Sequence, residues 1–310
     1  MNAAASPPRR RPLDELVPIL NRASIEKSYV PLRDIAWDAP EMALVPGDPR
    51  LALPPHAALA QTAWYRALDA ATQSALGLRV LVQTLAYGVS FESVLSRGLL
   101  ELAAALPQGS PLFRYALHEV CEEAHHSMMF RELIDRAGVP VDPLPRLDAM
   151  LDPYVIRSGR TFPTLFFFAV WGGELFVDAD NRAMLRHRDR LHPLVAEILR
   201  IHVTEEARHL SFAASYLDEH LPRLGRARRA ALGYAVPLTL AGPLRLMLQP
   251  SRGVVADFAI PDAVLAEAFG PDSEHRRRVI AIAEPVRRTC EAHGLYERRH
   301  VAAWRWFGLA

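Results

Sequence analysis

The sequence predicts an all-α protein whose centre is a four-helix bundle built from a duplicated helical hairpin. Three observations support this fold class. Apolar residues recur with helical spacing along most of the chain, whereas alternating, strand-like segments are scarce. Proline and glycine interrupt the helical pattern at intervals that suit short connections between helices. A segment near residue 120 is also echoed near residue 205, as expected for a repeated hairpin.

Seven segments carry the helical pattern. The expected helices are 57–75, 77–106, 111–137, 163–187, 192–220, 226–249 and 273–293. Pro107, Gly109 and Pro111 separate the second helix from the third, and Gly138 ends the third. Pro237 and Pro243 lie inside the sixth segment, which we therefore expect to be kinked or split.

The chain before residue 56 has a different character. Residues 1–55 contain many of the 25 prolines and are expected to form an irregular arm. Its first part, MNAAASPPRRRPLDE, has no apolar segment behind it and is interpreted as a disordered lead-in instead of a signal peptide. No linker divides the remainder. We therefore expect one domain over 56–310, with the bundle at about 77–220 and additional N- and C-terminal helices around it.

Composition argues against several classes of partner. The 310 residues are 50% hydrophobic and carry a net charge of +1, so nothing favours nucleic acid or an anionic membrane. The basic stretch RLGRARRA (223–230) is more typical of a solvated helix face. Cys121 and Cys290 cannot form a disulfide framework, which favours a reducing, cytoplasmic location. The most apolar run (162–177) is shorter than a membrane span and contains Glu174.

The internal repeat places the same chemistry in both halves of the chain. The segment HVTEEARHLSF matches EVCEEAHHSMM at an offset of 83 residues. Glu123 and His126 thereby correspond to Glu206 and His209. Each pair is Glu-x-x-His, and residues three apart lie on one helix face, so both side chains can reach one metal ion. Two such helices are a feature of di-iron carboxylate bundles.

Helical rotation of about 100° per residue decides between the doubled letters of each repeat. Glu123 and Glu206 fall among the apolar residues of their helices and are expected to face the core. The residues expected to face outward are Glu122, His125, Glu205 and Arg208. The alternative is two ordinary surface faces rich in Glu and His. The repeat and the inward phase on both helices favour metal binding, since buried carboxylates need compensating cations or protons.

A bundle of this type needs one further carboxylate from each of two partner helices. In antiparallel neighbours, residues at equal distance from the connecting turn lie at equal height. The turn near 107 predicts a partner of Glu123 near residue 91, which selects Glu92 over Glu101. The turn near 189–191 selects Glu174 in the same way. A lone buried Glu is more often salt-bridged, but two at the predicted heights favour ligands.

One position breaks the repeat, because His202 stands where the first half has Glu119. His202 precedes Glu206 by four residues and shares its face, so it is expected to be a third imidazole ligand; the alternative is a core or supporting histidine. The predicted ligand set is Glu92, Glu123, His126, Glu174, His202, Glu206 and His209. Glu119, and Asp178 one turn after Glu174, are expected to support ligands from behind.

Mixed carboxylate and imidazole ligands suit iron or manganese better than a metal that prefers thiolates. Zinc stays open, although the HExxH motif is absent: His118-Glu119 is followed by Val-Cys-Glu. Two adjacent irons can pass two electrons to dioxygen. Spacing and periodicity therefore predict a dinuclear site that activates oxygen or handles metal.

Several motifs of the sequence also resemble those of a known protein family. Glu92 together with EEAHH, GGELFVDADN and HVTEEARH resembles the ferritin-like di-iron N-oxygenases typified by para-aminobenzoate N-oxygenase. The segment KSYVPLRDIAWDAPE (27–41) is also similar to that family, and the likeness covers about 25–220. The tail HGLYERRHVAAWRWFG is compatible but less diagnostic. By matching position, the resemblance implies that the seven predicted ligands hold two irons, with one Glu-x-x-His per metal and at least one bridging carboxylate.

The resemblance also implies an activity. In this family, reduced di-iron reacts with dioxygen to give a peroxo-di-iron(III) species, which oxidises an amine to the hydroxylamine and in some members to the nitro group. It implies an arylamine substrate, an external electron donor, a homodimer and a place in secondary metabolism such as antibiotic biosynthesis. Phe167, Trp171 and Phe212 could line a substrate pocket, although aromatic residues at helical spacing are more typical of a core.

Three other functions stay open at this point. A di-iron oxygenase that attacks a C–H bond or another centre would have the same ligands. A ferritin-like ferroxidase or metal-binding protein would need no organic substrate, but no acidic tract suggests an iron path. A metal-free helical scaffold would leave the inward Glu and His residues uncompensated.

Overall fold

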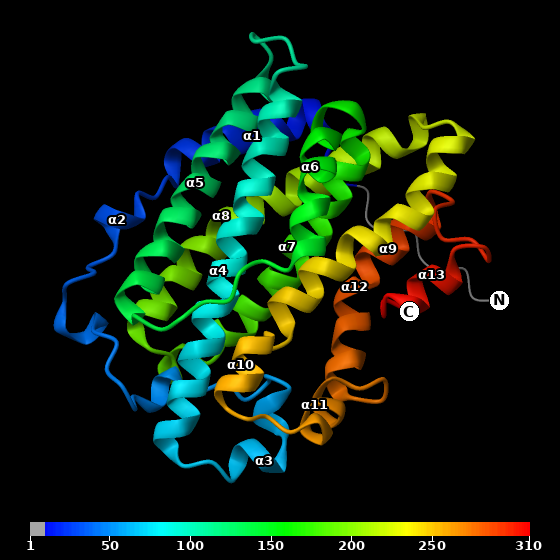
Figure 1. Cartoon of the computed structure of the whole chain (residues 1–310). Coiled ribbons are helices and arrows are strands. Elements are labelled where there is room, and N and C mark those ends of the chain that lie inside the picture. The colour runs from blue at the N-terminus through cyan, green and yellow to red at the C-terminus, as the bar shows by residue number, and fades with distance from the viewer. Residues whose placement is uncertain (1–9) are drawn as a thin grey trace.

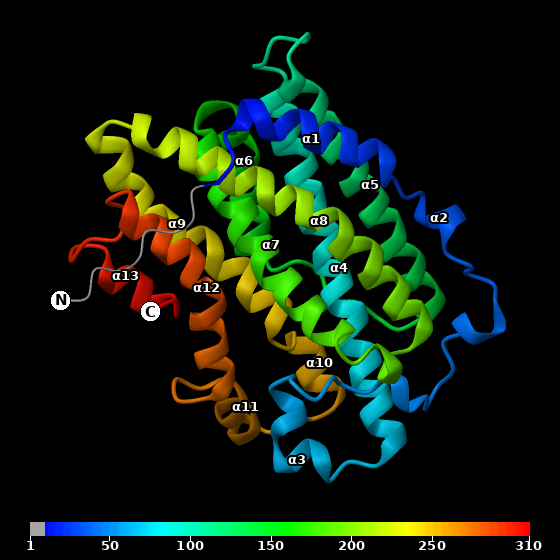
Figure 2. The ribbon, with the colours of Figure 1, turned by 180° about the vertical axis from the view of Figure 1, so that it is seen from behind.

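Four long helices form the centre of the computed structural model, which describes residues 10–310 (Figure 1). They are α4 (Ala70–Ala103), α5 (Pro111–Ala137), α7 (Pro163–Leu185) and α8 (Pro193–His220). α4 packs along α5 and α7 packs along α8, so the bundle consists of two hairpins (Figures 1 and 2). Every regular element of the described chain is helical, which confirms the all-α, ferritin-like fold class.

The ends of the bundle helices follow from local sequence. Ser110 caps α5 by accepting a hydrogen bond from the amide of Phe113, and Pro111 occupies the first turn, where no amide partner is needed. Gly138 ends α5 with φ of 61°, a conformation that favours glycine. Asp69 caps α4 through the amide of Thr72. These caps set the register of the helices that carry the site.

Further helices surround the bundle. The remaining α-helices are α1 (Leu13–Glu26), α2 (Pro31–Asp34), α3 (Ala63–Arg66), α6 (Arg146–Thr161), α9 (Arg226–Leu248), α10 (Arg252–Asp257), α11 (Asp262–Phe269), α12 (Glu274–Ala292) and α13 (Val301–Trp306). Short 3₁₀ turns are Pro40–Met42, Pro49–Leu51, Leu59–Gln61, Arg188–Arg190 and Leu221–Arg223. α1 packs on α5 and α8 (Figure 2), whereas α9 and α12 pack on α7 (Figure 1).

The N-terminal part differs from the prediction. Residues 1–9 of the expected disordered lead-in lie outside the described residues, but Leu13–Glu26 is a helix, so the arm is not irregular throughout. Leu16, Val17 and Leu20 are buried against the bundle. The amphipathic spacing of these residues stabilises α1 despite the internal Pro18, and proline density alone was a misleading signal.

The helices differ from the prediction at three other places. The helix expected at 57–75 is instead the 3₁₀ turn at 59–61 followed by α3, because Asp69 starts a new helix. α6 was missed because it follows the proline-rich segment 139–145 and contains Pro153. α9 continues through Pro237 and Pro243 without being split.

Aromatic residues from α7 and α8 fill the core at one end of the bundle. Phe167, Trp171 and Phe212 are each at most 2% exposed and belong to the same apolar cluster. They line neither of the two cavities described below, so their role is packing instead of substrate contact.

Two helical segments are long and apolar enough to cross a membrane, namely α4 and Arg226–Asp257. This is weak evidence, because core helices of proteins that have no membrane span pass the same test. In α4 half of the apolar window is buried inside the protein, and the same helix carries Glu92 into the bundle.

Candidate metal centre

The seven predicted ligands come together in the middle of the bundle. One comes from α4, two from α5, one from α7 and three from α8, and each is at most 2% exposed. Their donor atoms form overlapping groups in which all atoms lie within 4.8 Å of one another. These groups are Glu92–His126–His202, Glu123–His126–Glu206, Glu174–His202–Glu206 and Glu119–Glu123–His209. Both the helical phase and the equal-height argument therefore placed these side chains correctly.

The two Glu-x-x-His pairs are related by an approximate twofold arrangement. Nδ1 of His126 lies 3.0 Å from Glu123 and 3.3 Å from Glu206. Nδ1 of His209 lies 3.2 Å from Glu206 and 3.1 Å from Glu123. In both histidines Nδ1 thus faces the central carboxylates, and each central carboxylate lies between two imidazoles, as a bridging ligand would.

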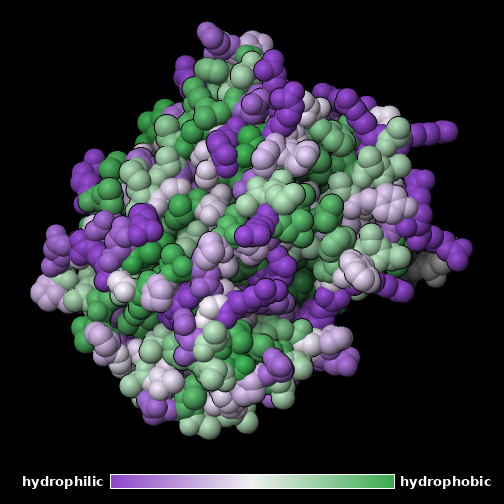
Figure 3. Space-filling view, viewed as in Figure 1, coloured by the Kyte–Doolittle hydropathy of each residue, from purple (hydrophilic) through white to green (hydrophobic). Residues whose placement is uncertain are grey.

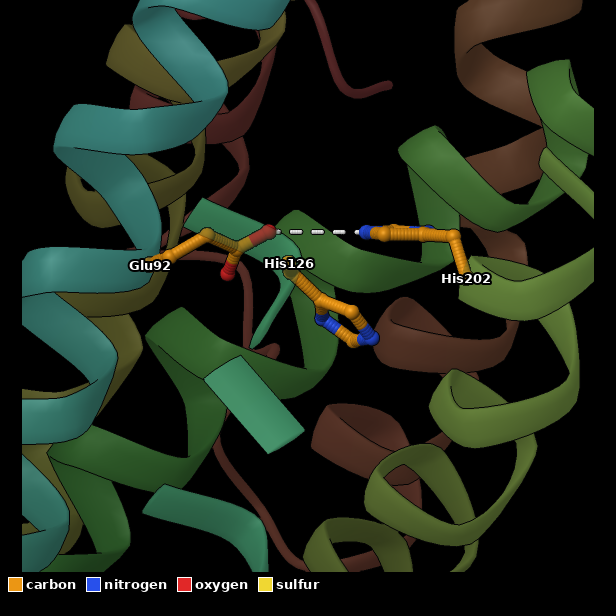
Figure 4. A group of neighbouring side chains, drawn as sticks. All are labelled: Glu92, His126 and His202. Carbon is orange, nitrogen blue, oxygen red and sulfur yellow. Dashed lines mark hydrogen bonds and ion pairs between the residues drawn. The ribbon is translucent and has the colours of Figure 1, made fainter. Parts of the chain in front are cut away.

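His202 enters the cluster differently. Its Nε2 faces Glu92 Oε1 at 3.4 Å, across the space beside His126 (Figure 4). Its Nδ1 lies 3.3 Å from the side-chain amide of Asn181. Burial, reinforced by the charge of His126, lowers the pKa of His202 to about 4, so the imidazole is neutral and able to bind a metal. Asn181 was not predicted; it is one turn further along α7 than Val177 and had no repeat partner to mark it.

Several buried carboxylate oxygens of this cluster have no hydrogen-bond partner. They are both oxygens of Glu119 and Glu174, Oε2 of Glu92, and Oε1 of Glu206. Fully buried carboxylates without partners are strongly unfavourable unless protons or cations compensate them. The donor set, made of hard oxygens and imidazole nitrogens, fits two iron or manganese ions.

The ionisation of the cluster is consistent with cation binding. Burial, followed by the charge of neighbouring carboxylates, raises the pKa of Glu92 and Glu174 well above the ordinary value. Burial alone would lower the pKa of His126 and His209, but the surrounding carboxylates more than offset it and raise both pKa values well above 6.5. The raised pKa values favour protons on these groups, and a bound metal could take over the same compensation.

Three of the four residues that were expected to face outward do not do so. Glu122, Glu205 and Arg208 are buried, and only His125 stays partly exposed. The prediction was wrong because α5 and α8 pack against each other, so the contact between the two helices covers these side chains as well. A usable signal existed: the first Glu of each doublet repeats at the same offset as the second.

These buried residues connect the two hairpins crosswise. Glu205 of α8 lies 2.9 Å from Nε2 of His126 on α5, and Glu122 of α5 lies 2.7 Å from Nε2 of His209 on α8. Arg208 forms ion pairs with Glu122 at 2.9 Å and with Glu205 at 3.6 Å. Neither contact has the geometry of a hydrogen bond. Each carboxylate holds the outer nitrogen of a histidine and so orients Nδ1 inward.

The two residues that were expected to support ligands, Asp178 and Glu119, have different outcomes. Asp178 pairs with Arg182 of the same helix at 2.7 Å, and no ligand histidine is among its hydrogen-bond partners. That expectation was wrong. Glu119 is fully buried and its carboxylate lies within 4.8 Å of donor atoms of Glu123 and His209. Burial raises the pKa of Glu119 to about 8.

Known proteins provide an independent comparison. The family model described as P-aminobenzoate N-oxygenase AurF matches residues 13–294. The chain belongs to this family. Relatives of the AurF-family chain include the uncharacterized protein Mb0909 of Mycobacterium bovis and the uncharacterized protein Rv0885 of Mycobacterium tuberculosis. Each is 35% identical over 291 residues, which cover 94% of this chain and 86% of the relative. No solved structure matches.

Membership of the AurF family supports a di-iron oxygenase, and the buried Glu and His groups provide a place for the metals. The match extends beyond the bundle to residue 294, so the covering helices α9 and α12 belong to the family architecture as well.

Proposed function

We propose that this protein is a di-iron monooxygenase that N-oxygenates a primary amine, with an arylamine as the first substrate class to test. One observation carries the proposal: seven buried Glu and His side chains converge at the centre of an AurF-family bundle, and several of their oxygens have no hydrogen-bond partner. The proposed ligands are Glu92, Glu123, His126, Glu174, His202, Glu206 and His209. Manganese is a second candidate ion.

Two irons held there would supply the electrons that activate dioxygen. The overall reaction balances when R–NH₂, O₂, two protons and two electrons give R–NHOH and H₂O. One oxygen atom forms the new N–O bond and the other leaves as water. The two electrons come from an external donor, and further rounds would lead towards the nitro product.

The protein's own residues determine where the amine meets the metals. A cavity of about 170 Å³ borders Glu92, Glu174 and His202. Its other walls near the site include the apolar side chains of Phe130 and Val177. Such walls limit water near the reacting nitrogen. Glu205 holds His126 from behind and Glu122 holds His209, so the reaction space lies on the His202 side.

We further propose a cytoplasmic, homodimeric enzyme of secondary metabolism. The cytoplasmic assignment is supported by its two cysteines, which are both free: Cys121 is exposed and Cys290 is buried. The homodimer and the metabolic role rest on the family resemblance. Gel filtration with light scattering tests the dimer, and a single-chain mass would contradict it.

The test is turnover by full-length protein loaded with ferrous iron. With a chemical reductant, ¹⁸O₂ and aniline, we expect a hydroxylamine whose nitrogen carries one ¹⁸O atom, detected by mass spectrometry. Glu206→Gln should bind less iron and form no such product. A product labelled only on carbon would favour a C–H hydroxylase. Iron oxidation that accelerates with added ferrous iron but not with amine would favour a ferroxidase.

A further inference from the structure

A second cavity lies beside the one at the metal centre. It measures about 590 Å³, and α4, α6, α7 and α9 together with the C-terminal helices enclose it. Its walls are mainly apolar, with Val94, Leu165 and Leu244 among the buried or partly buried ones. Around its rim, Leu147 is 63% and Tyr154 76% exposed. Figure 3 shows apolar side chains gathering on this face, over α6 and α9.

The two cavities adjoin each other. Their shared lining residues are Phe91, Met247, Gln249, Phe269, His275 and Val279. Phe91 directly precedes Glu92 on α4, so the shared wall begins at the metal centre itself. The ring of Phe91 lies against Gly173, and a Cβ atom at Gly173 would clash with it. The glycine before Glu174 therefore makes room for the ring that stands between the two spaces.

Cavity size indicates what each space can hold. A cavity of about 150 Å³ accommodates benzene. The inner cavity, at about 170 Å³, is therefore matched to one aromatic ring or a group of similar size. The outer cavity is more than three times larger. A substrate confined to one ring would leave the outer cavity unused.

Charge argues against an anionic group on the substrate near the metals. The inner cavity has two guanidinium groups in its lining, and both are paired: Arg50 with Asp48 at 2.6 Å, and Arg278 with Asp180 at 2.8 Å. His56 also contacts Asp180, at 3.2 Å. A substrate carboxylate would have to displace one of these internal partners.

We propose that the substrate is an elongated, uncharged arylamine, with its amine-bearing ring in the inner cavity and an apolar chain extending past Phe91 into the outer cavity. This deepens the proposed function and rests on it. The apolar chain gains free energy from leaving water in the outer cavity, and the ring positions the nitrogen at Glu92, Glu174 and His202.

Binding of aniline and 4-hexylaniline to the full-length, iron-loaded protein without oxygen tests this proposal by calorimetry. Burial of a methylene group tightens binding roughly three- to fourfold. Allowing for incomplete burial, we expect 4-hexylaniline to bind at least about 100-fold tighter than aniline, with one molecule per chain. Ala235→Trp, which fills the outer cavity, should reduce this gain below about tenfold. Ala231→Trp, on an exposed position of the same helix, should preserve it.

Thermal unfolding and iron content of both variants verify that they are folded. Equal affinities for the two anilines in the unmodified protein, or an undiminished gain in folded Ala235→Trp, would overturn the proposal. Tighter binding of 4-hexylaniline with the expected loss in Ala235→Trp, but no oxidation of any amine, would support the two-cavity assignment and refute the N-oxygenase function.

Discussion

The α4–α5 and α7–α8 hairpins share one plan but differ at three informative positions. Glu119 of α5 corresponds to His202 of α8, and His125 corresponds to Arg208. On the partner helices, Phe91 precedes Glu92 where Gly173 precedes Glu174. The features that both hairpins share are the central carboxylates and imidazoles, and each of two metals would need one such set. The differences lie where two equivalent side chains would compete for one space or one counter-charge.

Each difference has a physical consequence. A single Arg208 serves both Glu122 and Glu205, so a second arginine at position 125 is not needed. The Phe91 ring occupies the room that Gly173 leaves, so only one of the two positions can be large. The α7–α8 hairpin brings its extra histidine, His202, to the side of the inner cavity. Its counterpart Glu119 instead lies beside the opposite histidine, His209.

The largest expected effect concerns the part that both hairpins share. Glu123→Gln and Glu206→Gln remove one central negative charge each while keeping the side-chain shape. Both variants should lose more than about half of the bound iron, and to a similar extent, because Glu123 and Glu206 each lie next to both His126 and His209 and would serve both metal positions. Elemental analysis after iron loading measures this. Glu101→Gln on α4, outside the cluster, is the control and should bind iron normally; unequal losses would break the symmetry.

The next effect distinguishes Arg208 from its counterpart. Arg208→Met leaves Glu122 and Glu205 buried without their shared cation, and should lower the free energy of unfolding by about 3 kcal/mol. His125→Met, at the equivalent but partly exposed position, should change it by less than about 0.5 kcal/mol. Urea unfolding of the protein without added metal gives both values. Similar effects of the two changes would refute the unequal roles.

The crossed carboxylates should behave alike. Glu122→Gln and Glu205→Gln each weaken the contact that orients a histidine of the opposite hairpin, so iron affinity should fall roughly 10- to 100-fold in both. Competition with a chelator of known affinity measures this change. If only one variant weakened iron binding, the two crosswise contacts would contribute unequally to iron affinity, and the prediction would be wrong.

The smallest expected effect tests the fit of Phe91 against Gly173. Gly173→Ala should destabilise the protein by about 1–3 kcal/mol because the added methyl group forces the ring aside. In the Phe91→Ala background the same change should have much less effect, which a double-mutant cycle detects. Gly109→Ala, where nothing lies near the added atom, is the control. Additive effects at positions 91 and 173 would contradict the contact.

Much of the bundle could be predicted because its signals are local. Caps and breakers at Ser110, Pro111 and Gly138 determined the limits of α5, and the periodic apolar residues gave the inward direction of Glu123. The equal-height argument located Glu92 and Glu174, since antiparallel helices joined by short turns have a fixed register. α1 and α6 were missed because both lie in a proline-rich setting and contain an internal proline, Pro18 in α1 and Pro153 in α6.

The sequence by itself determined the all-α class, the repeated Glu-x-x-His pairs and the seven side chains that meet in the bundle. Helical periodicity fixes such relations within one element, whatever packs outside it. Only the tertiary structure decided that Glu122, Glu205 and Arg208 are buried, that Asp178 turns to Arg182, and that two cavities meet at Phe91. Those outcomes depend on how closely neighbouring helices approach, and that distance is set by side chains far apart in the chain.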